Sequence, residues 1–261
     1  KNGFNGAIIG SSGGVDSALT AAIAADALGP DRVKTVMMPF KYTSDMSLQD
    51  AQKLAKNLNV KHEIIEIKDI YDSFEQSLKK EFEGKEKDNT EENLQSRSRG
   101  VVLMAMSNKS GYLVLTTGNK SETAVGYSTL YGDTAGGFAV LKDVPKTWVY
   151  ELAKYRNTIS NVIPQRIIER PPSAELAPNQ KDSDSLPEYK ILDEIIEMYV
   201  EKDLSAITIT NKGFDEVTVK RVVNLIDKSE YKRRQAPPGV RITDRSFGKD
   251  RRYPITNKYS Q

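Results

Sequence analysis

Apolar residues in the first half of the chain alternate between short runs and longer stretches with helical spacing. The short runs predict four strands, at residues 6–9, 33–38, 61–67 and 112–116. The periodic stretches between them predict four helices, at residues 17–28, 47–58, 70–82 and 90–107. Strands joined by such helices require right-handed crossovers, which build a parallel sheet. We therefore expect an α/β fold, with an open parallel sheet and helices on both of its faces.

Helix-boundary signals accompany this pattern. Ser47, with Asp50 three positions later, resembles a capping box at the start of the second helix. Thr90 is placed to cap the fourth helix, and Gly29 with Pro30 ends the first.

The second half of the chain predicts a helical C-terminal part. Residues 118–137 are rich in Gly, Ser and Thr and look too polar for a core element. Helical patterns lie at residues 146–157, 165–168, 187–200, 205–211 and 216–228. Residues 170–186 contain three prolines, and long irregular segments are commonly functional. We expect this segment and the loop at 83–89 to be lids that order over a substrate.

Composition excludes several kinds of chemistry. The 261 residues include no cysteine and one histidine, so disulfides, thiolate nucleophiles and Cys/His zinc sites are excluded. His62 lies in an alternating stretch, which favours an ordinary strand position over a catalytic one. Any catalysis must rest on Lys, Arg, carboxylates, hydroxyls, backbone amides or a hard metal ion.

Charge and hydropathy restrict the partners. A net charge of +2 argues against a general nucleic-acid binder, and no apolar run approaches the length of a membrane span. A cytoplasmic location is expected. Basic residues crowd the end of the chain, so we treat 229–261 as a basic C-terminal arm of the same domain.

The sequence GSSGGVDSA at Gly10–Ala18 lies between the first strand and the first helix. In open parallel sheets this turn is the favoured phosphate site, because glycines let the backbone approach and the helix N-terminus offers free amides. A Walker loop would carry a lysine where Asp16 stands, and a carboxylate in an anion site requires a cation between the two. We therefore expect Mg²⁺ on Asp16, bridging to phosphate. The alternative is a flexible linker.

The segment SGGVDS resembles the loop of the ATP pyrophosphatases, which cleave ATP to AMP and pyrophosphate while adenylating a substrate. Five further segments look like the synthetase domain of NAD synthetases, most like the bacterial glutamine-dependent form. They are ENLQSRSRG (92–100), TTGNKSE (116–122), YGDTAGGFAVLKDV (131–144), PSAEL (172–176) and YKRRQAPPG (231–239). The resemblance implies a Rossmann-like adenine nucleotide alpha hydrolase fold and the amidation of deamido-NAD through an adenylated intermediate, with ATP as co-substrate.

The resemblance also implies which residues form the site. The ATP-binding residues would be Gly10, Ser11, Ser12, Gly13, Gly14, Val15, Asp16, Ser17, Thr117, Lys146 and Ser173. The deamido-NAD-binding residues would be Asn93, Arg97, Glu122, Asp133 and Lys232. Arg99 could hold the phosphates of deamido-NAD together with Arg97, and the neighbouring Arg233 and Arg234 would strengthen the anionic site. The metal ligands would be Asp16 and Glu122.

Some of these roles have alternatives. Lys142 competes with Lys146 as the phosphate stabiliser, and Glu122 is assigned to either deamido-NAD or a metal. Asp133 is equally well explained as an ordinary Gly-Asp turn. Arg97 and Arg99 could instead form a solvated helix face. Ser11 stands where the glutamine-dependent family often has an apolar residue.

A glutamine-dependent enzyme also carries a glutaminase domain with a catalytic Cys, which this sequence lacks. We therefore expect 1–261 to be a single synthetase domain, either excised or shortened at its start, that uses ammonia. A glutaminase domain or partner would belong to a longer protein. The resemblance further implies a homodimer. Two alternatives are another amidating ATP pyrophosphatase, such as a GMP synthetase fragment, and a nucleotide-binding domain without turnover.

Overall fold

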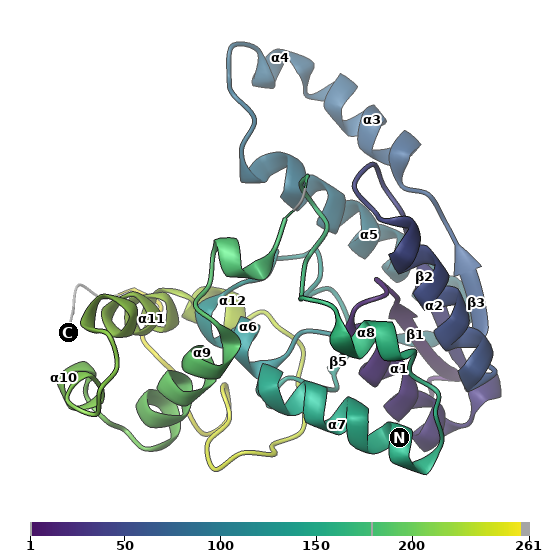
Figure 1. Cartoon of the computed structure of the whole chain (residues 1–261). Coiled ribbons are helices and arrows are strands. Elements are labelled where there is room, and N and C mark those ends of the chain that lie inside the picture. Colours follow the sequence, from purple (N-terminus) through teal and green to yellow (C-terminus); the bar gives the residue numbers. More distant parts are fainter. Residues whose placement is uncertain (1, 179, 257–261) are drawn as a thin grey trace.

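The computed structural model describes residues 2–178 and 180–256, and in this part of the chain five parallel strands form one sheet (Figure 1). The strand order is β3-β2-β1-β4-β5. The strands are β1 Gly6–Gly10, β2 Val33–Met37, β3 Lys61–Ile64, β4 Tyr112–Thr116 and β5 Phe138–Ala139. The first four confirm the predicted strands, although β3 is shorter than expected. β5 was missed because two residues are too few to show a periodic pattern.

Helices cover both faces of the sheet, as predicted. Successive side chains of β1 point to opposite faces. Ile8 packs in a cluster that α5 (Asn89–Ser110) covers, whereas Ile9 packs in a cluster that includes Ala24 of α1 (Val15–Leu28). On the α1 side, a larger cluster also contains residues of α2 (Asp45–Leu58), α7 (Lys146–Ile159) and α8 (Gln165–Glu169).

Two predicted N-cap residues are wrong, because the true caps lie two or three residues earlier in the sequence. Ser44, not Ser47, caps α2, since its hydroxyl accepts a hydrogen bond from the Ser47 amide at 3.2 Å. Asp88, not Thr90, caps α5, accepting from the Thr90 amide at 2.7 Å. In both cases several polar residues precede the helix. The periodic pattern does not show which of them starts the first turn.

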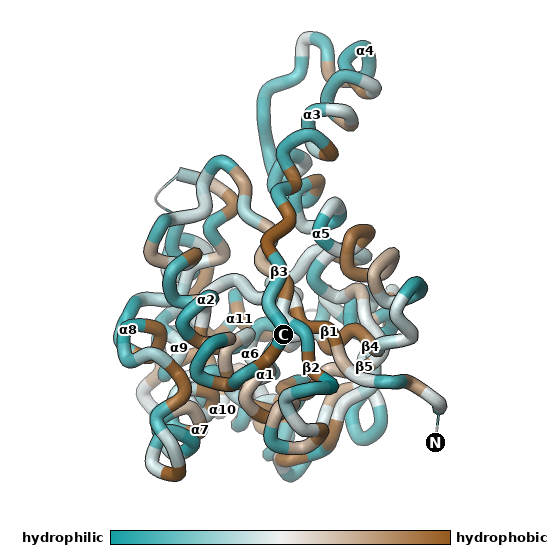
Figure 2. The backbone as a smooth tube through the Cα atoms, turned by 90° about the vertical axis from the view of Figure 1, so that its right-hand side faces the viewer, coloured by the Kyte–Doolittle hydropathy of each residue, from teal (hydrophilic) through white to brown (hydrophobic). Residues whose placement is uncertain are grey.

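The predicted helix at 70–82 consists of two helices that break at Leu78, α3 (Lys68–Ser77) and α4 (Lys79–Phe82). These helices extend away from the sheet, and their tube is largely hydrophilic in Figure 2. None of the helices among the described residues is long and apolar enough to cross a membrane.

The prediction that residues 118–137 contain no core element is wrong. They include α6 (Lys120–Val125), most of which is buried. Lys120 is fully buried, and its ammonium lies 3.0 Å from Asp143 Oδ1 and 2.8 Å from Glu201 Oε1. A charge can be buried when it is paired and hydrogen-bonded. Composition does not show such partners, because they are distant in the sequence.

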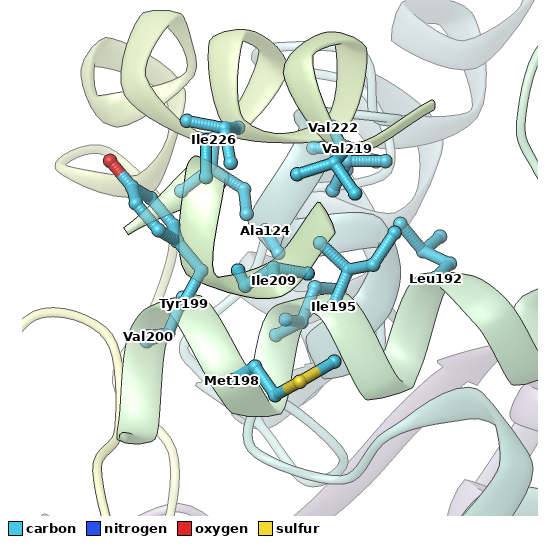
Figure 3. Packing of buried hydrophobic residues seen from close by; sticks show 14 of the residues in the cluster. Ala124, Leu192, Ile195, Met198, Tyr199, Val200, Ile209, Val219, Val222 and Ile226 are labelled. Carbon is cyan, nitrogen blue, oxygen red and sulfur yellow. The ribbon is translucent and has the colours of Figure 1, made fainter. Parts of the chain in front are cut away.

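The C-terminal helices pack around a second core, shown in Figure 3. They are α9 (Tyr189–Ile196), which continues as a π-helical turn (Glu197–Glu201), α10 (Ala206–Thr210), α11 (Glu216–Lys228) and α12 (Glu230–Arg233). Short 3₁₀ turns lie at Pro30–Arg32 and Asp182–Asp184. The arm expected at 229–261 contributes Phe247 and Tyr253 to this core, and its residues 257–261 lie outside the described part.

Candidate active site

A cavity of about 260 Å³ opens beyond the carboxyl ends of β1 and β4. Its wall is formed by the loop after β1, by Thr117 after β4, by the N-terminal turns of α6 and α7, and by the segment after α8. Lys232 of the C-terminal helices closes one side. The carboxyl edge of a parallel sheet is the expected place for a ligand.

The loop after β1 is held in a compact turn by its own hydroxyls. The Ser12 hydroxyl accepts from the Gly14 amide at 3.2 Å, and the Ser17 hydroxyl donates to the Gly14 carbonyl at 3.0 Å. Gly13 has a φ of +76°, and a Cβ there would lie 2.6 Å from the carbonyl oxygen of Ser47. Only glycine fits this position. The loop is therefore an ordered turn and not a flexible linker.

Asp16, Glu122 and Lys146 meet at the cavity wall from three helices. The Lys146 ammonium lies 2.5 Å from Asp16 Oδ2 and 3.3 Å from Glu122 Oε1. Asn119, the N-cap of α6, donates to Asp16 Oδ1 at 2.8 Å and accepts from the Glu122 amide at 2.9 Å. One cation thus balances two carboxylates in a partly buried cluster.

Burial and charge shift the pKa values of this cluster. Burial raises the pKa of Glu122, and the Lys146 ammonium opposes this shift only in part. Burial alone would lower the pKa of Lys146, but Asp16 and Glu122 outweigh it and raise the pKa above the ordinary range. Lys146 is therefore a permanent cation beside the predicted phosphate loop, residues 10–17.

The structure brings most of the expected site residues to this cavity. Those that line it are Ser12, Gly14, Val15, Asp16, Ser17, Thr117, Glu122, Asp133, Lys142, Lys146, Ser173 and Lys232. Gly10 and Ser11 instead line an adjoining cavity of about 170 Å³, together with Met37, Met38 and Leu103. The Ser11 hydroxyl is buried without a hydrogen-bond partner among the described residues.

Asn93 and Arg97 line neither of these two cavities. Asn93 Oδ1 accepts from the Thr129 hydroxyl at 2.8 Å, and Arg97 Nε donates to the Leu130 backbone carbonyl at 3.2 Å. Both side chains therefore support residues 129–130. That stretch leads to Asp133, which accepts from the Thr129 amide at 3.0 Å.

The three lysines of the cavity differ in their surroundings. Lys142 donates to the Pro237 carbonyl at 2.6 Å, and Lys232 donates to the carbonyls of Gly126 and Ser128 at 2.8 and 2.7 Å. Burial lowers the pKa of Lys142 and of Lys232. Lys146 is the one of the three that forms an ion pair with Asp16.

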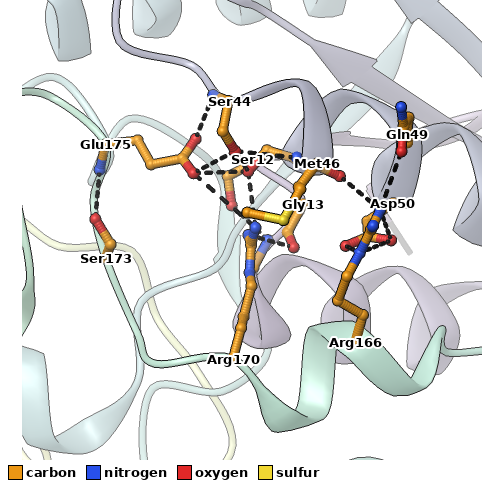
Figure 4. Close-up of polar contacts among 12 residues, drawn as sticks. Ser12, Gly13, Ser44, Met46, Gln49, Asp50, Arg166, Arg170, Ser173 and Glu175 are labelled. Atoms are coloured by element: carbon orange, nitrogen blue, oxygen red, sulfur yellow. Dashed lines mark hydrogen bonds and ion pairs between the residues drawn. The ribbon is translucent and has the colours of Figure 1, made fainter. Parts of the chain in front are cut away.

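Arg170 was missed by the sequence analysis. It donates to the Gly13 carbonyl at 2.6 Å and to the Ser47 hydroxyl at 2.8 Å, so it touches the phosphate loop directly (Figure 4). Glu175 accepts from the hydroxyls of Ser44 and Ser47 at 2.9 and 2.8 Å. These contacts fasten the irregular segment after α8 to the loop and to α2. The sequence signal that could have indicated Arg170 is its place directly before two prolines, at the start of the irregular segment.

Arg99 is a second cation at the cavity, and the sequence analysis paired it with Arg97 as a possible phosphate contact. It lines both cavities and donates from Nε to the Met38 carbonyl at 3.0 Å. Burial lowers its pKa to about 10, so it stays charged at neutral pH. Arg99 is better placed than Arg97 to meet an anionic ligand.

Comparison with known proteins gives the family of the chain. The NAD synthase family model matches residues 1–236. A glutamine-dependent NAD(+) synthetase of Acinetobacter baylyi is 59% identical over 98% of this chain, which covers 48% of that protein.

Two solved structures are also similar. The ADP complex of a glutamine-dependent NAD+ synthetase from Acinetobacter baumannii is 54% identical, with a TM-score of 0.65, over 97% of this chain and 46% of that one. An NH3-dependent NAD synthetase from Campylobacter jejuni is 28% identical, with a TM-score of 0.68, over 88% of this chain and 87% of that one.

This chain spans about half the length of the curated relatives it matches. The family match nevertheless covers most of the chain, including the phosphate loop and the lysine, glutamate and asparagine that surround Asp16. The chain therefore belongs to the NAD synthase family.

Proposed function

We propose that the chain catalyses the ATP-dependent amidation of deamido-NAD to NAD, with ammonia as nitrogen donor. One observation carries the proposal: the Asp16, Glu122 and Lys146 cluster lies directly beside a phosphate loop at the carboxyl edge of the sheet. A domain that only bound a nucleotide would have little need for this arrangement of charges. The family match favours this function over that of another amidating ATP pyrophosphatase.

The reaction has two steps. In the first step, a carboxylate oxygen of the nicotinate attacks the α-phosphorus of ATP, and the bond to the pyrophosphate oxygen breaks. In the second step, ammonia attacks the activated carbonyl carbon, AMP leaves, and one proton is released. No protein nucleophile is required. The protein must position the reactants and stabilise negative charge.

The cavity residues divide this work. The amides and hydroxyls of residues 12–17 would hold the pyrophosphate, while Lys146 and Arg170 would stabilise its developing charge. The adjoining cavity, with Met38 and Leu103, suits the adenosine part of ATP, and Thr117 borders both cavities. Ser11 then faces the adenosine side and not the phosphates.

Asp16 and Glu122 would hold Mg²⁺. Among the described residues no group of three or more His, Asp or Glu is placed to bind a metal, so the protein would supply two carboxylates. That donor set fits Mg²⁺, which typically keeps waters and substrate phosphates as its other ligands. When bound, the ion would neutralise the phosphates. Because Glu122 contacts Lys146 and lies beside Asp16, we assign it to the metal and not to deamido-NAD.

Deamido-NAD would enter on the side of Asp133 and Lys232. Arg99 and Lys232 supply positive charge there, and Arg233 also borders the cavity. Asn93 and Arg97 would act indirectly, by holding the turn that carries Asp133. Ser173, on the segment after α8, would contact ATP from above the loop.

The test is a steady-state assay of the purified chain with ATP, Mg²⁺, deamido-NAD and ammonium. We expect NAD, AMP and pyrophosphate in equal amounts, and no turnover when glutamine replaces ammonium. Xanthosine monophosphate serves as the competing acceptor. Turnover of that acceptor alone would favour a GMP synthetase. Nucleotide binding without pyrophosphate release would favour a binding domain, and glutamine-supported turnover would contradict the choice of nitrogen donor.

We also propose a homodimer, a glutaminase domain or partner in the longer protein, and a cytoplasmic location. In support of the dimer, α5 exposes the apolar side chains of Val101 and Met104. Light scattering at several protein concentrations would measure the assembly, and a monomer at every concentration would contradict it. Imaging of the tagged full-length protein would test the location.

A further inference from the structure

Hydrogen bonds connect α6, which carries Glu122, with the start of α7, which carries Lys146. Pro145 precedes α7, and this helix has no capping side chain from its own N-cap residue. The first amides of a helix lack acceptors within the helix, so they must find them elsewhere. In α7 those amides belong to Lys146 itself and to Thr147.

The missing acceptors come from α6 and α9. The Ser121 hydroxyl accepts from the Lys146 amide at 2.8 Å. Asp193 Oδ2 accepts from the Thr147 amide at 2.9 Å and from its hydroxyl at 2.8 Å. The Ser121 hydroxyl in turn donates to Asp193 Oδ1. One carboxylate therefore connects the start of α7 with the residue that precedes Glu122.

The hydrogen bonds between Ser121, Asp193 and the start of α7 are protected from water. Ser121 is fully buried, so water cannot replace its two hydrogen bonds. Asp193 is flanked in the sequence of α9 by Leu192 and Ile195, which are both fully buried in the C-terminal core. A carboxylate at a helix N-terminus is also favoured by the helix dipole. Through Asp193, α9 thus bonds to two helices of the cavity wall although it does not line the cavity itself.

We infer that Asp193, acting through Ser121, is a positioning residue that sets the separation of Lys146 and Glu122 at the cavity. The inference rests on the proposed function and adds to it a residue that touches neither substrate nor metal. Adenylation depends on the placement of charged groups, and a displacement of about 1 Å can cost on the order of a hundredfold in rate. The bonds of Asp193 should therefore affect turnover more than they affect stability.

The test compares Asp193→Asn and Ser121→Ala with a matched control, Asp215→Asn. Asp215 caps α11 in the same manner, accepting from the Thr218 amide at 2.8 Å and from its hydroxyl at 2.7 Å, but it does not line the cavity. We expect about a tenfold or greater loss of kcat for pyrophosphate release in the two variants, with KM for ATP within about twofold of the original. Asp215→Asn should lose similar thermal stability and keep its kcat.

The double variant tests whether Asp193 acts through Ser121. Two residues that share a hydrogen bond give effects that are not additive. We expect the kcat of the double variant to match the lower of the two single variants. Fully additive losses, or a loss of kcat in Asp215→Asn equal to that in Asp193→Asn, would overturn the inference.

A crystal structure of Ser121→Ala supplies a readout that does not require activity. We expect the Lys146 ammonium to move away from Glu122 relative to the original protein, and unchanged distances would overturn the inference. If the original chain releases no pyrophosphate, the proposed function fails. The structural comparison then still decides whether Asp193 and Ser121 position Lys146.

Discussion

Lys146 Nζ lies 2.5 Å from Asp16 Oδ2, although the two residues are 130 positions apart in the sequence. The lysine side chain is only 3% exposed, and the same ammonium also reaches Glu122. The cation that neutralises the two carboxylates therefore occupies the place where a metal ion would have to bind. If Asp16 and Glu122 hold Mg²⁺ as proposed, Lys146 would compete with the ion for these oxygens.

Replacing Asp16 with Asn removes the proposed metal ligand at constant size. We expect at least about a hundredfold loss of pyrophosphate release, because the charge that holds the metal and the phosphates in register is gone. The melting temperature should change little. Asp26→Asn is the control, since Asp26 lies on the same helix but pairs with Arg156 at the surface. Near-normal turnover in Asp16→Asn would refute the metal role.

Replacing Lys146 with Met leaves Asp16 and Glu122 close together without a cation. We expect a loss of stability of up to about 3 kcal/mol without Mg²⁺, because one partner of a partly buried ion pair is removed. Added Mg²⁺ should raise the melting temperature more in this variant than in the original protein. Thermal unfolding with and without Mg²⁺ measures this. Lys154→Met, on an exposed part of the same helix, is the control. Equal responses to Mg²⁺ would contradict the competition.

Replacing Glu122 with Gln separates its two candidate roles. If Glu122 holds the metal, the Mg²⁺ concentration for half-maximal turnover should rise about tenfold or more, while KM for deamido-NAD changes little. Titrations of Mg²⁺ and of deamido-NAD at saturating ATP measure the two effects. A large rise in KM for deamido-NAD, with an unchanged Mg²⁺ requirement, would assign the residue to the substrate.

Replacing Arg170 with Met removes a cation beside the phosphate loop. It also removes the hydrogen bonds from Arg170 to Gly13 and Ser47, which hold residues 170–186 against the loop and α2. We expect KM for ATP to rise about tenfold, as is reasonable for the loss of a charged hydrogen bond. Initial rates over a range of ATP concentrations provide the measurement. The control is Arg166→Met, four residues earlier, because Arg166 pairs with Asp50 away from the cavity. Equal effects of the two substitutions would contradict a specific role for Arg170.

His62 gives a pH dependence of stability. Burial lowers the pKa of His62, so in the window below its ordinary value of 6.5 the folded protein binds fewer protons than the unfolded chain. Its contribution to stability is therefore lost as the pH falls through that window. Urea unfolding of the original protein and of His62→Gln between about pH 5 and pH 8 would measure this. As the pH falls, the free energy of unfolding of the original protein should decrease relative to that of His62→Gln. A difference that stays constant over this pH range would contradict the role of His62.

Local sequence signals determined the order of the elements. The apolar runs at residues 6–9, 33–38 and 112–116 and the helices between them are confirmed, because burial in a parallel sheet leaves a pattern within a few adjacent residues. Helix starts were less predictable. Ser44 and Asp88 cap helices that the pattern assigned to Ser47 and Thr90, since the capping bond depends on which polar residue adopts extended backbone.

The sequence by itself also predicts a phosphate site at GSSGGVDSA, since the loop lies between a strand and a helix and its Asp calls for a cation. Only the tertiary structure decided what surrounds that Asp. Lys146, Glu122 and Arg170 reach the loop from helices and segments more than a hundred residues away, and Lys120 could be buried only because Asp143 and Glu201 meet it there. Charge pairing acts across space and leaves no period in the sequence, so these contacts exist only once the chain has folded.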